Sequence, residues 1–353
     1  MAVTVGMIGC GHIARFHFAG LKKAGARVKW VCDLNAQAAR PWAEQFQAAA
    51  TARPEEVFSD PEVQAVWVLT TTATHRPLCL AAIAAGKAVV CEKTLAGNAD
   101  DALEIARLAE QRRTVFYTSY MKRFIPAVQD AKKLLPSVGR IITTHIRAHQ
   151  CWGAALWSVP PTSGWLSVPT GGISGLRAKI GGGILLAGGS HIMDLVHFFF
   201  GRVRRLYGFI QTQPGFDVDN HASALLETDH GAVHYEALAH PLTRIGYLRD
   251  GWDERIEITG TAGRLEILSA KWDQPEHKAS VLRHYDEAAG KVAEHCYEPV
   301  SPFERAAAFF CEQIGRNEQG AQSRLTGYET DEVLEHIRLS AARREAVEVK
   351  YRL

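Results

Sequence analysis

The sequence predicts an α/β fold in two parts, a parallel sheet covered by helices and then an antiparallel or mixed sheet. Two observations lead to this prediction. Up to about residue 120, apolar strand-like runs alternate with helical patterns, and this alternation is typical of a parallel sheet with helices on both faces. From about residue 140, strand patterns follow one another without helices between them, which favours antiparallel pairing.

The first part is organised by short runs of β-branched and apolar residues without polar alternation. Such runs predict strands that are covered on both faces. In chain order we expect a strand at Val3–Ile8, a helix at Ile13–Ala24, a strand at Val28–Cys32, a helix at Ala36–Gln47, a strand at Ala65–Leu69, a helix at Arg76–Ala85, a strand at Ala88–Cys91, a helix at Ala99–Arg112 and a strand at Val115–Tyr120.

The change of pattern places a domain boundary near residues 120–125. A chain of 353 residues agrees with two domains at about 150 residues each, and we expect them at residues 1–122 and 123–353. In the second domain, strands are expected at Ile141–Ala148, Arg204–Gln213, His221–Thr228, Ala232–His240, Arg255–Thr259 and Arg264–Leu268, and helices at Ile184–Phe200, Pro302–Gly315 and Tyr328–Glu345.

Composition excludes several classes of partner. The formal charge is only +2 and there is no block of like charge, so we expect a small-molecule ligand and no nucleic acid. The seven cysteines are scattered and never in CxxC spacing, which argues against a disulfide framework or a metal site and for reduced thiols in a cytoplasmic protein. We expect no targeting segment and no contact with a membrane.

A glycine-rich turn, Gly9-Cys-Gly-His-Ile-Ala14, directly follows the first strand and opens a helix. In this setting Gly9 allows a tight turn, Gly11 lets a pyrophosphate approach the backbone, and Ala14 permits close helix packing. The phosphates would lie at the helix N-terminus, where free N–H groups favour negative charge. The alternative is a glycine-rich turn that binds no ligand.

Asp33, at the end of the second strand, supports the dinucleotide interpretation. A carboxylate at this point accepts hydrogen bonds from the adenosine ribose and would repel the 2′-phosphate of NADP. Leu34 and Asn35 follow instead of an arginine, so we predict NAD rather than NADP. The alternative is that Asp33 only starts a turn with Asn35.

The stretch Ala88–Gly97 (AVVCEKTLAG) ends an apolar strand abruptly on Glu92 and Lys93. Ligands of open parallel sheets bind at the carboxyl ends of the strands. A lysine near a nicotinamide ring, or partly desolvated, has a lowered pKa and can exchange a proton with a substrate hydroxyl. The alternative is a local pair between Lys93 and Glu92.

A second polar cluster lies in Gly181–Asp194 (GGGILLAGGSHIMD). If the segment after Gly183 is helical, Ala187, His191 and Asp194 project to one face, where His191 and Asp194 could grip vicinal hydroxyls. Gly188 and Gly189 are costly inside a helix and suggest close approach of another backbone or of a ligand. The alternative for His191 is an ordinary core or surface histidine.

These residues together resemble the glucose-fructose oxidoreductase and inositol dehydrogenase family along nearly the whole chain. The similar motifs are Glu92-Lys93-Thr94 (family EKP), Leu69–His75 with Ala85-Gly86-Lys87 (ATPNxxH and AGKHV), the glycine cluster ending in His191-Ile-Met-Asp194 (GGGxxxDxGxHxxD) and Glu257–Leu265.

The resemblance implies an N-terminal Rossmann domain and a C-terminal α/β domain on a large open, mostly antiparallel sheet that often forms homodimers or homotetramers. It implies hydride transfer between NAD(P) and a carbon of a sugar or cyclitol, with Lys93 and His191 exchanging the proton and Asp194 at the substrate. The cofactor contacts are then expected from Gly9, Gly11, His12, Ile13, Asp33, Thr70, Thr71, His75, Glu92 and Lys93.

Further substrate contacts are expected around the start of the second domain. Lys122, Arg123 and His149 are candidates for an anionic group of the substrate. The Gly- and Pro-rich stretch from Cys151 to Gly183 carries tryptophans that could stack on sugar faces or close the site, or instead pack as an arm on a neighbouring subunit. These tryptophans are Trp152, Trp157 and Trp165.

Three departures from the family pattern leave other functions open. Ala187 stands where the motif has an aspartate, Thr94 replaces a proline, and Thr71 and Thr72 replace the Pro and Asn of ATPN. Ordinary inositol oxidation is therefore disfavoured. One alternative is a glycoside hydrolase that retains its NAD and acts by transient oxidation, elimination and re-reduction. Another is a dinucleotide-binding sensor or assembly partner without catalysis.

Overall fold

The computed structural model describes residues 2–153, 182–213, 216–274 and 277–353. Contacts divide the chain into two compact units, the first of residues 1–121, 301–331 and 352–353, and the second of residues 122–300 and 332–351. The sequence-based division at residue 122 had assigned all of the chain beyond it to the second domain. Residues 301–331 instead group with the first unit.

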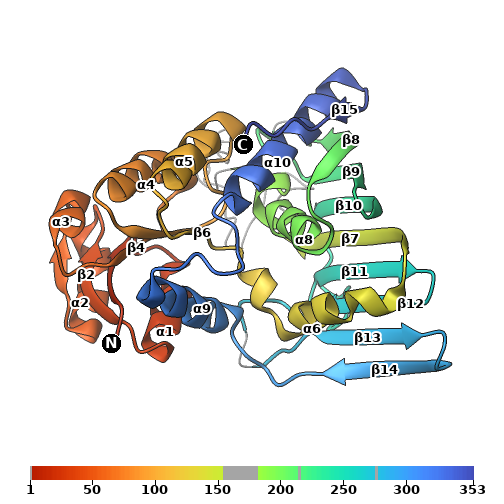
Figure 1. The fold of residues 1–353 in the computed structure, drawn as a ribbon, viewed down its shortest axis with the longest axis horizontal. Helices are drawn as coiled ribbons and strands as arrows, with labels where there is room; N and C mark the ends of the chain where they lie inside the picture. The colour runs from red at the N-terminus through yellow and green to blue at the C-terminus, as the bar shows by residue number, and fades with distance from the viewer. Residues whose placement is uncertain (1, 154–181, 214–215, 275–276) are drawn as a thin grey trace. The chain divides into compact units, whose positions relative to one another are not determined.

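The first unit is built on a six-stranded parallel sheet (Figure 1) with the order β3-β2-β1-β4-β5-β6, so the predicted doubly wound sheet is confirmed. The strand order reverses between β1 and β4, which makes this the point where ligands of such sheets bind. The strands are β1 (Thr4–Ile8), β2 (Arg27–Cys32), β3 (Ala49–Thr51), β4 (Ala65–Val68), β5 (Ala88–Cys91) and β6 (Phe116–Thr118).

Helices connect these strands where the amphipathic stretches predicted them. The sequence did not predict β3 and α3, because an exposed three-residue strand and a six-residue helix carry too little apolar periodicity. The helices are α1 (Ala14–Lys23), α2 (Ala36–Phe46), α3 (Pro54–Ser59), the 3₁₀ turn η1 (Thr72–Thr74), α4 (His75–Ala84) and α5 (Ala99–Gln111).

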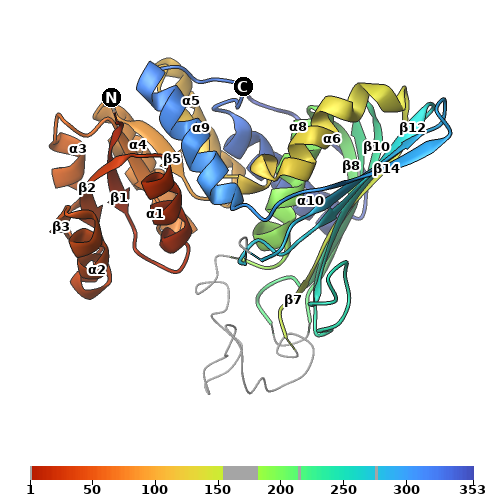
Figure 2. The same ribbon diagram turned by 90° about the horizontal axis from the view of Figure 1, so that it is seen from below.

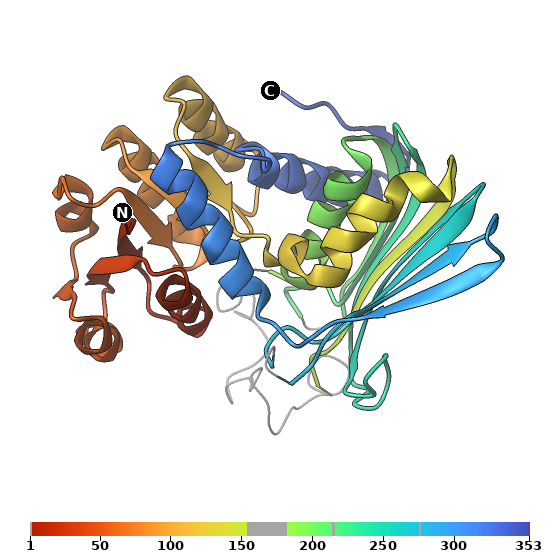
Figure 3. The ribbon, with the colours of Figure 1, turned by 60° about the horizontal axis from the view of Figure 1, so that its bottom comes forward.

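A late segment of the chain completes this unit. Helix α9 (Pro302–Arg316) lies against α1 (Figure 3), with the Phe303 ring stacked on Phe16 at 5.1 Å between centroids. Near the middle of α9 the Phe310 ring stacks on Tyr117 of β6 at 4.6 Å between centroids. These buried aromatic contacts explain why the chain returns to the first unit. The start of α10 (Thr326–Arg343) follows it there.

The second unit contains a nine-stranded sheet with the order β14-β13-β12-β11-β7-β10-β9-β8-β15. All neighbours are antiparallel except β7 and β10, which run parallel, so the predicted mostly antiparallel sheet is confirmed. The strands are β7 (Ile141–Cys151), β8 (Val203–Gln211), β9 (His221–Thr228), β10 (Gly231–His240), β11 (Trp252–Gly260), β12 (Gly263–Ser269), β13 (Val281–Asp286), β14 (Lys291–Cys296) and β15 (Val347–Glu348).

Helices of the second unit pack on one face of this sheet (Figure 2). Each strand alternates, so residues such as Ile146 of β7 and Tyr235 of β10 are buried under the helices while their neighbours point to the other face. The elements on the covered side are the 3₁₀ turn η2 (Met121–Phe124), α6 (Pro126–Leu134), the 3₁₀ turn η3 (Leu135–Val138), the π-helical segment η5 (Leu185–Gly189), α8 (Ser190–Phe200) and the end of α10. Among the described residues, none of the helices is long and apolar enough to cross a membrane.

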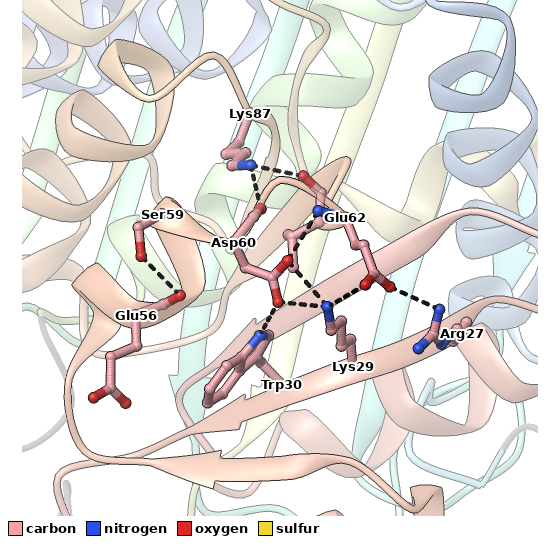
Figure 4. Close-up of polar contacts among 9 residues, drawn as sticks. Arg27, Lys29, Trp30, Glu56, Ser59, Asp60, Glu62 and Lys87 are labelled. Carbon is pink, nitrogen blue, oxygen red and sulfur yellow. Dashed lines mark hydrogen bonds and ion pairs between the residues drawn. The ribbon is translucent and has the colours of Figure 1, made fainter.

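A polar cluster ties the rim of the parallel sheet together (Figure 4). The Asp60 carboxylate, just after α3, accepts hydrogen bonds from the Trp30 indole at 2.7 Å and from Lys29 Nζ at 3.0 Å. Lys87, directly before β5, donates to the carbonyl oxygens of Asp60 and Val63. The Lys29 ammonium, followed by the Trp30 N–H, lowers the pKa of Asp60 from its ordinary 3.8 to about 2.

We expect Asp60→Asn to lower the free energy of unfolding by about 1–3 kcal/mol, the usual cost of losing a charge-assisted hydrogen bond. Because the pKa of Asp60 is lower in the folded than in the unfolded protein, the Asp60 carboxylate stabilises the fold above pH 4, and this stabilisation is lost as the pH falls through about 2. Urea unfolding at pH 7 and pH 3 checks both points. Glu62→Gln, at a side chain 56% exposed, is the control and should change stability little.

Candidate active site

The turn after β1 lies at the point where the strand order reverses. Gly9 has φ +98°, and a Cβ there would lie 2.8 Å from the backbone of Leu69 and Thr70, so the two loops after β1 and β4 touch through a glycine. At Gly11 no atom of the described residues lies within 4 Å of the Cβ position. Helix α1 begins at Ala14 without a side-chain cap or an acidic residue in its first turn, which leaves N–H groups available to a phosphate.

Asp33 combines both interpretations of its sequence position. One carboxylate oxygen accepts a hydrogen bond from the Cys10 backbone N–H at 2.7 Å, and the other accepts one from the Asn35 N–H at 2.8 Å. Asp33 thus starts the turn with Asn35 and also orients the glycine-rich turn. Each carboxylate oxygen can accept more than one hydrogen bond, so a ribose hydroxyl can still bind this partly exposed side chain.

We expect Asp33→Ser to improve the use of NADP relative to NAD by at least about tenfold. The substitution removes the charge that repels a 2′-phosphate and keeps a small hydrogen-bonding group. The ratio of kcat/KM values for the two cofactors measures the change. Because Asp33 also binds the Cys10 N–H, the melting temperature should be recorded as a control, and an unchanged cofactor ratio in a stable variant would contradict the assignment.

His75 links the loops after β4 and β5. It is buried, and its Nδ1 lies 3.0 Å from the carbonyl oxygen of Thr94 and 3.1 Å from that of Leu95, while its Nε2 lies 3.1 Å from the carbonyl oxygen of Thr70. Burial lowers the pKa of His75, and the carbonyl contacts oppose that effect. His75 therefore shapes the loop edge, and its predicted contact with the cofactor stays a prediction.

Lys93 lies at the carboxyl end of β5 beside a buried pair. The Glu92 carboxylate is 2.8 Å from Nε2 of His17 on α1 and accepts the Lys93 backbone N–H at 3.0 Å. The peptide bond between Lys93 and Thr94 is cis. Asp331 accepts hydrogen bonds from the N–H groups of Ala96 and Gly97 at 2.8 and 3.0 Å. The loop is therefore fixed by Glu92 at Lys93 and by Asp331 three and four residues later.

His17 is a site residue that the sequence analysis missed. It is a buried polar residue between Phe16 and Phe18 on a helix that packs inward, and buried polar side chains usually have a partner. That pattern could have indicated a specific contact, but its partner Glu92 lies far away in the sequence.

The predicted cofactor residues all belong to the carboxyl edge of the parallel sheet: Gly9, Gly11, His12 and Ile13 after β1, Asp33 after β2, Thr70, Thr71 and His75 after β4, and Glu92 and Lys93 after β5.

In the second unit, the glycine cluster forms a π-helical turn before α8. The Gly189 N–H donates to the carbonyl oxygen of Ile184, five residues back, at 2.8 Å, and Asp219 binds the start of the segment by accepting the Leu185 N–H at 2.7 Å. The regular α-helical spacing that was assumed between Ala187 and His191 is therefore wrong across this turn. A π turn inserts one extra residue and is frequent at functional sites.

Gly188 and Gly189 permit close contacts, but their nearest contacts are with side chains of the sheet and not with the backbone or ligand that the sequence suggested. A Cβ at Gly188 would lie 2.5 Å from the Gln150 side-chain nitrogen, and one at Gly189 would lie 2.2 Å from the Tyr235 hydroxyl. The approaching groups are side chains of β7 and β10. The helical segment can thus lie directly on the sheet.

His191 lies in the first turn of α8 and Asp194 follows in the next turn, and both are buried. Arg123, in η2, donates from Nε to both Asp194 oxygens at 3.0 and 2.8 Å and from a terminal nitrogen at 2.7 Å. Asp194 thus forms a bidentate ion pair inside the unit. Its predicted contact with substrate, and that of Arg123, stay predictions.

Lys122 and Trp152 belong to one buried polar network. Lys122 pairs with Glu254 of β11, whose other oxygen accepts the Gln150 side-chain N–H at 2.9 Å. The Trp152 indole donates to the Gln150 side-chain oxygen at 3.1 Å. The structure brings these residues together beneath the π turn through Gln150. The other tryptophans of this stretch, Trp157 and Trp165, lie outside the described residues.

His149 lies on the opposite face of the sheet from α8. It neighbours Gln150 on β7, and consecutive strand residues point to opposite faces. Its Nε2 is 2.8 Å from Glu236, which also contacts His221 at 3.1 Å, and these histidines lower the pKa of Glu236. The structure therefore does not bring His149 together with His191.

The doubly wound sheet, the open glycine turn and Asp33 define a dinucleotide-binding protein. Residues 3–120 match the family model described as the oxidoreductase family, NAD-binding Rossmann fold, and residues 128–266 match the GFO/IDH/MocA C-terminal domain. Because the two models together match most of the chain, it belongs to the glucose-fructose oxidoreductase and inositol dehydrogenase family, as the resemblance indicated. Its N-terminal domain is an NAD-binding Rossmann domain.

Relatives of known name include an inositol 2-dehydrogenase of Gluconacetobacter diazotrophicus, 37% identical over 155 residues that cover 41% of this chain and 45% of the relative. A 1,5-anhydro-D-fructose reductase of Ensifer adhaerens is 31% identical over 197 residues, 55% of each protein. The chain spans about half the length of these relatives in the matches. A levoglucosan dehydrogenase crystallised with NADH and levoglucosan aligns with TM-score 0.81 and 20% identity over 99% of this chain and 100% of that one, which supports the fold.

Proposed function

We propose that the protein is an NAD-dependent oxidoreductase that transfers hydride between the nicotinamide and a secondary alcohol or ketone carbon of a sugar, sugar derivative or cyclitol. The observation that carries the proposal is the position of Lys93 after the carboxyl end of β5, on the edge that also bears the open glycine turn, with its backbone N–H bound to Glu92 and Glu92 in turn bound to His17. The matches to an inositol dehydrogenase and an anhydrofructose reductase support the substrate class.

In this mechanism Lys93 removes the hydroxyl proton during oxidation and returns it during reduction, and His191 assists the transfer. Bound NAD supplies the hydride-accepting carbon. Glu92 fixes the Lys93 backbone and so the point from which the lysine side chain extends, and alignment of reacting groups is a large part of the rate gain in such reactions. The contact of both groups with one substrate carbon is part of the proposal.

Absorbance at 340 nm tests the proposal directly. Purified protein with excess NAD and a panel of cyclitols, anhydrosugars and free sugars should form NADH with at least one neutral polyol. Nucleotide that co-purifies, identified by native mass spectrometry, would show whether cofactor leaves after each cycle. If NAD binds but no compound of the panel is oxidised and no keto sugar is reduced by NADH, the proposed reaction is wrong.

A glycoside hydrolase that retains NAD is the second candidate. The observation that favours it is Ala187, which leaves a methyl group in the π turn where the family motif has a carboxylate. Incubation of glycosides with sub-stoichiometric NAD distinguishes the two reactions. A hydrolase releases aglycone over many turnovers without net NADH, whereas an oxidoreductase forms NADH in proportion to product.

We also infer a homodimer or homotetramer in which the open face of the large sheet binds a second copy. On this face Tyr207, Phe209 and Leu225 of β8 and β9 are 49%, 51% and 46% exposed and line a hollow of about 380 Å³ with His145 and His234. Large exposed apolar patches mark interaction sites. Toward β12–β14, the charged side chains of the same face already pair with each other, as Arg283 does with Glu294. The face therefore needs no charged partner, and the apolar patch of a second copy of this chain fits it best.

Leu225→Glu should convert the oligomer to a monomer, because it places a charge at the centre of the apolar patch. Light scattering after size-exclusion chromatography measures the mass of both forms. Val292→Glu on β14, at an exposed apolar side chain away from the patch, is the matched control and should not change the mass. A monomeric wild-type protein would contradict the inference.

The seven free cysteines support a cytoplasmic location.

A further inference from the structure

We propose that Lys122 and Arg123, two neighbours in the turn η2, are positioning residues that fix the helical segment bearing His191 on both sides of this histidine. The inference rests on the proposed function in that it gives His191 a catalytic task. It assigns to the dipeptide a role other than the expected contact with an anionic substrate group. Three sets of contacts within the second unit carry it.

Arg123 holds the segment on the C-terminal side of His191. Its guanidinium donates to both oxygens of Asp194, one helical turn after His191, and the Asp194 side chain has no exposed surface. The planar fork of arginine fixes both distance and orientation of a carboxylate. The pair therefore adds a directional contact to the apolar packing of α8, and this contact fixes the rotation of the helix and with it the direction of the imidazole.

Lys122 holds the segment on the N-terminal side through two further groups. Its ammonium pairs with Glu254, and Glu254 accepts the Gln150 side-chain N–H at 2.9 Å. Gln150 in turn lies so close to Gly188 that a Cβ there would be 2.5 Å from its nitrogen. Gly188 belongs to the π turn directly before α8. The network therefore contacts the turn that determines where α8 begins.

The charge balance favours positioning over direct substrate binding. Lys122 is buried and Arg123 is largely buried, with side chains 3% and 12% exposed, and each already pairs with a buried carboxylate. An anionic substrate group would have to share one of these cations with its carboxylate or displace that carboxylate, and either arrangement leaves an uncompensated negative charge in a largely buried place, which is strongly unfavourable. The arrangement therefore suits a neutral polyol better than a sugar acid.

Arg123→Met, Arg123→Lys and the double variant Arg123→Met with Asp194→Leu test the proposal. Misplacement of a catalytic group by about 1 Å can cost 10²-fold in rate, so we expect Arg123→Met to lower kcat by roughly 10- to 100-fold, with a smaller change in KM. Arg123→Lys keeps the positive charge but lacks the planar guanidinium, so its kcat should lie between those of the wild type and Arg123→Met. The Kd for NAD, measured by fluorescence titration, should stay within about twofold of wild type, because the first unit is intact.

The double variant separates positioning from simple stability. Replacing both charges with apolar side chains removes the buried unpaired carboxylate and should restore the melting temperature, while kcat stays low because the directional contact of the guanidinium with α8 is missing. Recovery of kcat together with stability would overturn the proposal. Lys278→Met, which breaks an ion pair with Asp250 that is also largely buried but lies outside these contacts, is the matched control and should leave kcat unchanged.

A readout without turnover keeps this test independent of the proposed reaction. In protein labelled with ¹³C-histidine, the His191 signal is assigned from its loss in His191→Gln. We expect that signal to shift in Arg123→Met and in the double variant, and to stay unchanged in Lys278→Met. An unshifted His191 signal in stable Arg123→Met protein refutes the positioning role, whereas a shifted signal in a protein that oxidises no sugar refutes only the proposed reaction.

Discussion

Replacement of Lys93 by alanine is expected to lower kcat for sugar oxidation by about 10²–10⁴-fold, the range typical for loss of a general acid or base. The Kd for NAD should remain close to the wild-type value, because the glycine turn and Asp33 are untouched. Stopped-flow or steady-state NADH formation measures kcat, and nucleotide fluorescence measures the Kd. The combination of lost turnover with retained binding is the signature of a residue that moves a proton.

Lys93→Arg is the matched control for the charge. Arginine keeps the positive charge but is not deprotonated near neutrality, so this variant should stay as inactive as Lys93→Ala if proton exchange is the role. Activity restored by arginine would mean that only the charge matters. Unchanged turnover in Lys93→Ala would refute the catalytic assignment and favour the interpretation as a dinucleotide-binding sensor.

Gly11→Ala is expected to weaken NAD binding by at least about 100-fold without lowering stability. In the described residues no atom lies within 4 Å of the Cβ position at Gly11, and the residue has no positive φ. A methyl group there is therefore tolerated by the fold and meets only an approaching pyrophosphate. Calorimetric titration with NAD and thermal unfolding without it measure the two effects separately.

Gly9→Ala is the informative comparison, because it should fail for a different reason. Its φ of +98° and the 2.8 Å approach to the backbone of Leu69 and Thr70 make any Cβ unfavourable in the folded protein itself. We expect this variant to lose stability before cofactor is added. If Gly11→Ala binds NAD like wild type, the pyrophosphate does not lie on this turn, and the cofactor assignment in its present form is wrong.

Local signals were enough for much of the first unit. The alternation of apolar runs and amphipathic stretches predicted β1, α1, β2 and most later elements, because each needs only its own periodicity. The glycine turn and Asp33 were also readable, since the phosphate-binding arrangement is a short segment between one strand and one helix. Elements with little apolar periodicity, such as β3, α3, β13 and β14, were missed.

Other features were decided only by the tertiary structure. His17 meets Glu92 across the first unit, Arg123 meets Asp194 across the second, and His149 points away from α8 although the sequence analysis had grouped it with the substrate.

By itself the sequence determined which segments become strands and helices, where a dinucleotide can bind, and which lysine ends a buried strand. The partners of the buried charges, the π turn before α8 and the return of α9 to the first unit were settled by tertiary contacts. The physical reason is that periodicity and turn chemistry act over a few neighbours. The pairing of a buried charge, in contrast, depends on which distant residue the packed core brings within hydrogen-bonding distance.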